Sequence, residues 1–186
     1  HAVVADAPAA DGTREAPVGV WSIPEDVLLV APAVRDIMIR VDGRLLRGDE
    51  ELRATWWTAE RGHDRDEYLK LCWLLRDVQA QRVMPIDRGL LDLLAGIQVW
   101  LDNSGKRLPM LVHSGYRTAR TNHRTEGAAL DSKHVVGQAA DISVPGVSNV
   151  KLAGLSSLLG VGGTGFYVGR GFVHVDTGSE RLWIDR

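Results

Sequence analysis

Two short segments in the last third of the chain constrain its fold more than any other part of the sequence. The first contains His134, Gly137 and Asp141, and the second, residues 172–176, is centred on His174. Alternate residues of a β-strand share a face, and a glycine lets the chain bend. If the two segments pair as antiparallel strands, the Asp141 carboxylate meets the His174 imidazole across the ladder. His134 then reaches both from the preceding loop.

These three side chains match the requirements of a catalytic zinc site. Such a site uses three nitrogen or oxygen ligands and leaves a fourth position open for water, whose pKa the ion lowers toward about 7. We therefore predict that His134, Asp141 and His174 bind Zn²⁺ and that the ion activates water for hydrolysis. The alternative is a purely structural cluster of the same side chains.

Composition restricts the remaining possibilities. The chain has 186 residues, 45% of them hydrophobic, which suffices for one core and predicts one domain over residues 20–186. Residues 1–19 are rich in Ala, Pro, Asp and Gly without an apolar period, which predicts a flexible N-terminal arm. The net charge of −2 argues against a nucleic-acid partner, and no apolar run is long enough for a membrane span. The single cysteine, Cys72, is predicted to be buried and inert.

Alternation and turn signals predict several extended segments. The alternating residues 37–41 are followed by Asp42-Gly43, which predicts a hairpin turn, and residues 52–57 predict a further strand. Residues 108–113 are predicted to form a strand as well. Residues 160–169 contain five glycines but neither a Gly-Lys-Ser/Thr sequence nor a following helix, so they predict a tight loop rather than a nucleotide site.

Apolar periodicity and capping residues predict the helices. A broad apolar face predicts one amphipathic helix over residues 64–81. Asp87 is predicted to cap a second helix that ends near residues 103–105. Shorter helices are predicted to begin near Thr118 and Ser148, and the latter is expected to end at Gly160.

A set of motifs spread over roughly residues 37–183 carries a family resemblance. The motifs are Ser114-Gly115-Tyr116-Arg117, Ser132-x-His134-x-x-Gly137-x-Ala139-x-Asp141 and Phe172-Val173-His174-Val175-Asp176-Thr177-Gly178, with residues 74–77, 85–87, 90–94, 162–167 and 181–183 in support. In combination they resemble the zinc D-Ala-D-Ala peptidase, hedgehog and lysostaphin superfamily. The closest similarity is to its murein endopeptidase K-like branch.

The resemblance implies a periplasmic or secreted peptidase that cleaves peptide cross-links in peptidoglycan. The bond would join either D-Ala to diaminopimelate or two diaminopimelate residues, and the partner would be peptidoglycan peptide stems, bound by a monomer. The implied fold is α+β, with a small antiparallel sheet that carries the zinc site and packs with helices. His134, Asp141 and His174 match the ligand positions of the family. Arg117 matches an arginine that holds a substrate carboxylate, and Ser132 matches a serine close to the metal.

The group that transfers the proton departs from the family pattern. Some relatives carry a histidine or an acidic residue shortly before the last ligand, where this chain has Gly171 and Phe172. Asp176 shares a strand face with His174, so we predict it as the general base. The alternative is that Asp176 orients a histidine ligand, as outer carboxylates of metal sites often do.

Two further tyrosines complete the predicted site. Tyr116 is predicted to form the cleft wall, with simple packing as the alternative, and Tyr167 is expected to be delivered to the site by the glycine-rich loop. The absence of a familiar base also leaves a second function open, a catalytically inactive zinc-containing module that binds peptidoglycan. Mass spectrometry of digested peptidoglycan separates an enzyme from such a binder.

Overall fold

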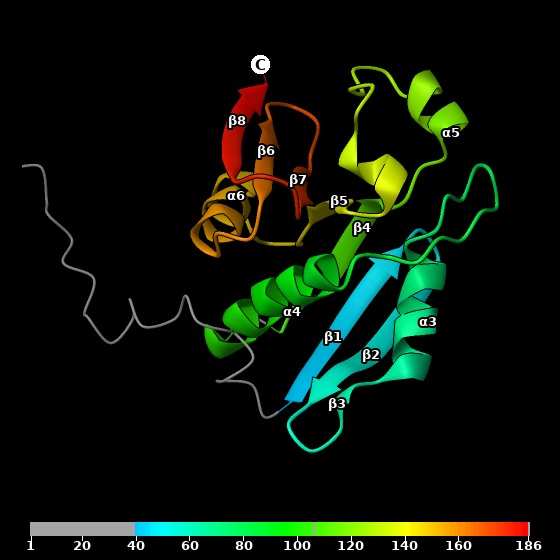
Figure 1. The fold of residues 1–186 in the computed structure, drawn as a ribbon. Coiled ribbons are helices and arrows are strands. Elements are labelled where there is room, and N and C mark those ends of the chain that lie inside the picture. Colours follow the sequence, from blue (N-terminus) through cyan, green and yellow to red (C-terminus); the bar gives the residue numbers. More distant parts are fainter. Residues whose placement is uncertain (1–39, 106, 186) are drawn as a thin grey trace, which may run out of the picture.

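The structure is a computed structural model that describes residues 40–105 and 107–185 (Figure 1). Strands and helices are interspersed along the described chain, which confirms the predicted α+β class. The predicted arm at residues 1–19, the predicted domain start at residue 20 and residues 37–39 of the first alternating segment lie outside the described residues.

Eight strands of the described chain form one sheet, in the order β3-β2-β1-β4-β5-β7-β6-β8. They are β1 (Arg40–Arg47), β2 (Glu50–Thr58), β3 (Gly62–His63), β4 (Met110–Ser114), β5 (Ala139–Ser143), β6 (Gly163–Tyr167), β7 (Val173–Asp176) and β8 (Arg181–Asp185). Strand β1 pairs with β4, and β6 with β8, in parallel. The sheet is therefore larger than predicted, and mixed rather than antiparallel. Alternation indicates which residues are extended, but it does not determine which distant strands become neighbours.

The first hairpin turns at a different place from the one predicted. Strand β1 runs through Asp42 and Gly43, and the chain reverses at Gly48 and Asp49. Gly48 has a φ of 57°, a backbone conformation that glycine adopts without strain. The prediction of a turn at Asp42-Gly43 is wrong because the strand continues to Leu45, which is buried in the core at 6% exposure. At this place the pairing of β1 with β2 shifts register, between Val41 and Asp42, and the strand does not turn.

The helices of the described chain are capped largely as predicted. They are α3 (Arg65–Leu74), α4 (Arg88–Asn103), α5 (Ala119–Arg124) and α6 (Asn149–Leu158), with a short 3-10 helix, η1 (Lys133–Val136). The side chains of Asp87, Thr118 and Ser148 accept hydrogen bonds from backbone N–H groups in the first turns of α4, α5 and α6. These contacts satisfy donors that have no partner within the helix.

Helix α3 is shorter than predicted. It ends at Leu74, and the buried Asp77 carboxylate accepts hydrogen bonds from the backbone N–H groups of Ala80 and Thr118. Asp77 also forms a backbone bridge to Arg82, which closes a turn. Val78, which lies within the predicted helix 64–81, is consequently 39% exposed. The contact of Asp77 with Thr118, far along the chain, thus ends the helix at Leu74 although the apolar periodicity continues.

The helices pack on the sheet and form one core. Helix α3 lies on β2, α4 on β1, and α6 on β6 and β7 (Figure 1). The largest fully buried apolar side chains come from both halves of the described chain: Leu75, Ile86, Leu90, Ile97, Met110, Ile142, Leu152, Val173 and Val175. Cys72 is buried among them, as predicted. The inner strands β5 and β7 are therefore anchored from one face, and their polar side chains project from the other.

The glycine-rich segment contains a strand, β6, rather than only the predicted loop. A Cβ atom at Gly163 would lie 2.5 Å from Oδ2 of Asp176, and one at Gly165 would lie 2.4 Å from the Trp183 ring. Glycine is therefore needed where side chains of β7 and β8 cross close to the β6 backbone.

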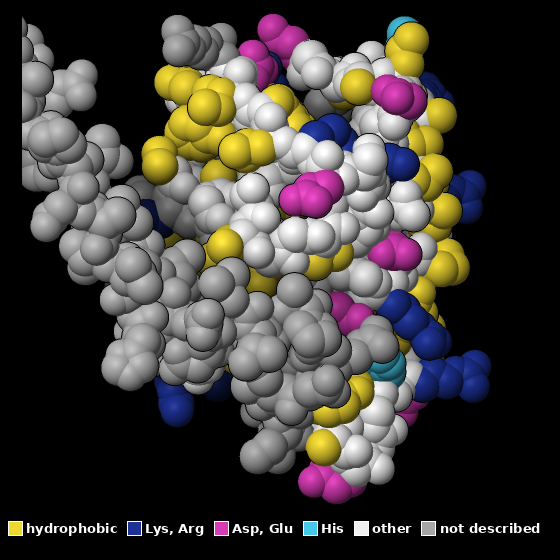
Figure 2. Space-filling model, turned by 60° about the vertical axis from the view of Figure 1, so that its left-hand side comes forward, with side chains coloured by type: hydrophobic (Ala, Val, Ile, Leu, Met, Phe, Trp, Pro, Cys, Tyr) yellow, Lys and Arg dark blue, Asp and Glu magenta, His cyan; other side chains and the backbone are white. Residues whose placement is uncertain are grey.

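The surface shows no dominant charge on the side drawn in Figure 2. Acidic and basic side chains are interspersed there, and the coloured residues form no continuous basic patch. This distribution agrees with the small net charge of −2. None of the helices in residues 40–105 and 107–185 has the length and apolar character of a membrane span.

Candidate metal centre

Three elements bring the predicted ligands together. Strands β5 and β7 pair antiparallel with Asp141 directly opposite His174, which confirms the predicted pairing. His134 lies on η1, and its backbone N–H donates to the hydroxyl of Ser132, the N-cap of this helix. Gly137, with a φ of 69°, then turns the chain into β5. A Cβ atom at Gly137 would lie 2.9 Å from the Pro85 carbonyl oxygen, so this bend requires glycine.

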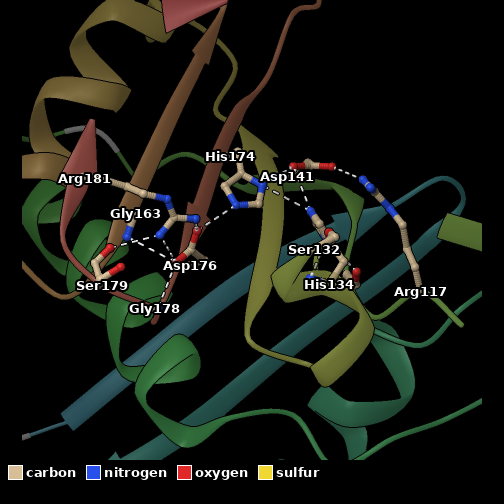
Figure 3. Close-up of polar contacts among 11 residues, drawn as sticks. Arg117, Ser132, His134, Asp141, Gly163, His174, Asp176, Gly178, Ser179 and Arg181 are labelled. Carbon is tan, nitrogen blue, oxygen red and sulfur yellow. Dashed lines mark hydrogen bonds and ion pairs between the residues drawn. The ribbon is translucent and has the colours of Figure 1, made fainter. Parts of the chain in front are cut away.

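The ligand atoms of these side chains face one another. Nε2 of His134 lies 3.2 Å from both Oδ1 of Asp141 and Nδ1 of His174, and the latter two atoms are 3.0 Å apart (Figure 3). All three residues are buried, and together they form a group that could hold a metal ion. Two imidazole nitrogens and one carboxylate oxygen are a donor set suited to catalytic zinc.

Hydrogen bonds on the far side of each ring determine which nitrogen carries a proton. Nδ1 of His134 lies 2.6 Å from the Gly115 carbonyl oxygen, and Nε2 of His174 lies 3.0 Å from Oδ2 of Asp176. Because a carbonyl and a carboxylate only accept, both of these nitrogens must donate. When the rings are neutral, the opposite nitrogens direct lone pairs toward Asp141. Three converging lone pairs repel one another unless a cation lies between them, so the site fits a metal ion.

The electrostatic environment also favours positive charge at the centre. Burial lowers the pKa of His134, which keeps its imidazole neutral and able to bind a metal. Burial alone would raise the pKa of Asp141, but His134 and His174 outweigh this effect and hold it well below its usual range. Burial likewise opposes charge on His174, yet Asp141 and Asp176 raise its pKa.

Asp176 lies behind His174, at the ring nitrogen that does not face the other ligands (Figure 3). Its carboxylate is fully buried and accepts hydrogen bonds from the backbone N–H groups of Gly163, at 3.2 Å, and Gly178, at 2.8 Å. The Arg181 guanidinium adds two contacts at 2.7 and 3.2 Å. His174, these backbone groups and Arg181 hold the pKa of Asp176 well below its usual range despite burial, which alone would raise it.

Arg117 lies on the opposite side of the ligand set. Its Nη2 forms an ion pair with Oδ2 of Asp141 (Figure 3). Its Nε donates to the Ser114 hydroxyl at 2.8 Å. Gly115, two residues before Arg117, packs closely against the end of α3. A Cβ atom at this position would lie 2.4 Å from the Leu75 carbonyl oxygen. The same carbonyl accepts a hydrogen bond from the backbone N–H of Tyr116.

A cleft of about 1140 Å³ opens over the ligand set. The four side chains predicted to bind substrate, Tyr116, Arg117, Ser132 and Tyr167, all line it together with the three ligands. Aromatic rings form one wall: the Trp183 ring lies 5.3 Å from the His174 ring, and the Tyr167 ring lies 5.3 Å from the Phe172 ring. The structure thus gathers every predicted substrate residue around the metal centre, while their role in binding stays a prediction.

Comparison with known proteins assigns the family. The model of the family described as peptidoglycan L,D-endopeptidase MepK matches residues 34–183. The chain belongs to this family. The resemblance predicted from the motifs is thereby confirmed, including its murein endopeptidase K-like branch.

Curated relatives agree with this assignment. Peptidoglycan L,D-endopeptidase MepK of Escherichia coli strain K12 is 38% identical over 144 residues, which cover 74% of this chain and 76% of the relative. A Haemophilus influenzae protein named probable peptidoglycan L,D-endopeptidase MepK is 34% identical over 118 residues, or 61% of this chain and 62% of the relative.

Several residues around the centre were not predicted from the sequence. Arg181, Gly163 and Gly178 surround Asp176, and the Gly115 carbonyl fixes His134. The glycines at 163 and 178 were visible as a concentration of glycine near the last ligand. The sequence holds no comparable signal for Arg181, because its contact depends on β8 lying beside β6.

Proposed function

We propose that this protein is a zinc-dependent endopeptidase that hydrolyses L,D cross-links in peptidoglycan. The observation that supports the proposal most directly is the convergence of two imidazole nitrogens and one carboxylate oxygen, from His134, His174 and Asp141, in a buried site. The cleft above them, with a volume of about 1140 Å³, can hold a peptide segment. Membership of the peptidoglycan L,D-endopeptidase MepK family supports the same substrate.

The name of the relatives favours one of the two cross-links considered from the sequence. A bond from D-Ala to diaminopimelate has a D-centre on both sides. A bond between two diaminopimelate residues joins an L-centre carbonyl to a D-centre nitrogen, and it is therefore an L,D bond. We assign this second cross-link as the substrate.

The side chains around the centre have distinct proposed tasks. A bound zinc ion would supply the activation of water and the polarisation of the scissile carbonyl. Gly115 and Asp176 hold the two histidine rings so that the correct nitrogens face the ion. Arg117 steadies Asp141 and keeps further N–H donors beside the ligand set. Those donors can bind the substrate carboxylate next to the scissile nitrogen, and this contact would position the bond.

We assign Asp176 the orienting role rather than that of general base. Its carboxylate oxygens are occupied by His174, two backbone N–H groups and Arg181, and it has no exposed surface. A base must reach the proton that it removes. The contacts of Asp176 instead favour fixing the tautomer of His174. The variant Asp176→Asn distinguishes the two roles.

The proposed substrate also implies the place of action. Peptidoglycan stems lie in the cell envelope, so we infer that the protein acts in the periplasm or after secretion. The monomeric state remains a prediction, and sedimentation analysis would test it.

Purified cross-linked muropeptides test the proposed function. The protein should cleave diaminopimelate–diaminopimelate dimers and release new amine ends detectable by mass spectrometry. A chelator or His134→Ala should abolish cleavage, and added Zn²⁺ should restore it only in the chelated parent. His123→Ala, which removes an exposed histidine of α5 outside the cleft, serves as the matched control. Binding of the dimers without any cleavage would instead support the inactive binding module.

A further inference from the structure

Arg170 stands at the tip of the loop that joins β6 to β7. It is exposed and lies between Gly169, with a φ of 87°, and Gly171, with a φ of 73°. Only glycine adopts such angles readily, so the two glycines form a tight turn that projects the arginine. The side chain lines the same cleft as the metal ligands.

Two contacts hold the guanidinium of Arg170 across the cleft. It lies 5.5 Å from the centre of the Tyr167 ring, and its Nη1 lies 3.4 Å from the Glu126 carbonyl oxygen. Glu126 belongs to the loop between α5 and η1, which rises beside the β6–β7 loop at the same end of the molecule (Figure 1). Arg170 therefore bridges the two loops that flank the cleft at this end.

The charge of Arg170 is not compensated in the described part of the chain. Among the other arginines that line the cleft, Arg117 pairs with Asp141 and Arg181 with Asp176. Arg47 is half-buried and donates to the backbone carbonyls of Leu74 and Arg76. Arg170 contacts a ring and one carbonyl oxygen, and no carboxylate of the described residues lies within 4.0 Å of it. Most of its N–H donors are thus available to an anion that enters the cleft.

In a diaminopimelate cross-link, each of the two diaminopimelate residues has a free carboxylate at its D-centre. One is attached to the D-centre whose nitrogen forms the scissile bond, so it lies beside the metal and within reach of Arg117. The other ends the side chain of the residue that supplies the carbonyl. It lies about six bonds, or roughly 7 Å when extended, from that carbonyl. To bind this carboxylate, the protein needs a second cationic side chain farther along the cleft.

We propose that Arg170, supported by Tyr167, forms the subsite for this second carboxylate. The inference rests on the proposed function and specifies which part of the substrate the cleft recognises. The rings of Tyr167 and Trp183 separate Arg170 from His174, which places the arginine away from the chemistry but along the same wall. A planar guanidinium held over a tyrosine ring is preorganised for bidentate contact with a carboxylate.

Binding of a product-like peptide tests the subsite without requiring catalysis. The probe is a peptidoglycan tripeptide stem that ends in diaminopimelate, with its D-centre carboxyl either free or amidated, and calorimetry measures the Kd. The parent should bind the free form about tenfold more tightly than the amidated form. This ratio is at the lower end of the range for a charge-assisted hydrogen bond, because Arg170 is exposed. Arg170→Ala should bind both forms with the weaker affinity.

A matched variant separates local contact from general charge. Arg65→Ala removes an exposed arginine of α3 outside the cleft and should keep the tenfold preference. Equal affinity of the parent for both stems, or a preference that survives in Arg170→Ala, would overturn the subsite. Failure of the proposed function has a different signature: cross-linked dimers would remain uncut while the preference for the free carboxylate persisted.

Discussion

Replacing Asp176 by asparagine should disturb the metal centre through the tautomer of His174. Oδ1 of Asp176 receives two backbone N–H groups, whereas Oδ2 receives Nε2 of His174 and Nη2 of Arg181. If the asparagine oxygen keeps the backbone contacts, its NH₂ group faces the ring. It can then bond only an unprotonated Nε2, which moves the proton to Nδ1, the nitrogen that should bind the metal.

The expected loss of zinc affinity is large. Groups that orient a metal ligand usually change affinity by 10- to 100-fold. Asp176→Asn should lie at the upper end, about 100-fold or about 2.7 kcal/mol, because it also removes the buried partner of Arg181. Competition with a chromophoric chelator measures the affinity, and the spectrum of a Co²⁺-substituted sample reports the ligand geometry.

Asp131→Asn provides the matched control. Asp131 is an exposed carboxylate of the same cleft, so this variant removes an equal charge without touching a ligand. Its zinc affinity should stay within about twofold of the parent, since screened surface charges contribute little. Parental zinc affinity in Asp176→Asn would refute the orienting role. If the same variant also lost hydrolysis, the sequence-based assignment of Asp176 as general base would be correct.

Two further perturbations probe the surroundings of the centre. Gly163→Ala would place a Cβ atom 2.5 Å from Oδ2 of Asp176 and should destabilise the fold by about 1–3 kcal/mol in thermal melts, with weaker zinc binding. Gly154→Ala, where nothing lies within 4 Å, is the control, and equal melting of the two variants would contradict the close approach. The zinc-free protein should lose stability in urea titrations as the pH falls from about 5 to about 2. The folded-state pKa values of Asp141 and Asp176 lie below their unfolded values, so the unfolded chain binds protons first; a flat profile would count against this.

The grouping of His134, Asp141 and His174 could be predicted because its determinants lie within short segments. Alternation in residues 139–143 and 172–176 fixes which side chains share a face, and the opposition of Asp141 and His174 follows once these strands pair. Helix caps such as Asp87 were also predictable, because the capping side chain and the N–H group that it binds are close in sequence.

The features that the sequence did not reveal depend on contacts between distant segments. The end of α3 is decided by Asp77, whose partner Thr118 comes 41 residues later. The assignment of β6 as a loop failed because glycine signals flexibility, whereas Gly163 and Gly165 make room for side chains of β7 and β8. The environment of Asp176 was hidden for the same reason, since Arg181 reaches it only after β8 joins the sheet.

The positions of β5 and β7 inside the sheet bear on when the proposed zinc ion would be bound. Each of these strands has a hydrogen-bonded neighbour on both sides, so backbone pairing holds Asp141 and His174 in place independently of an ion. In a zinc finger, by contrast, the chain is unfolded until the metal arrives. This protein is expected to complete its fold empty and to load zinc afterwards. The supply of zinc around the folded protein, rather than the folding process, would then set the active fraction.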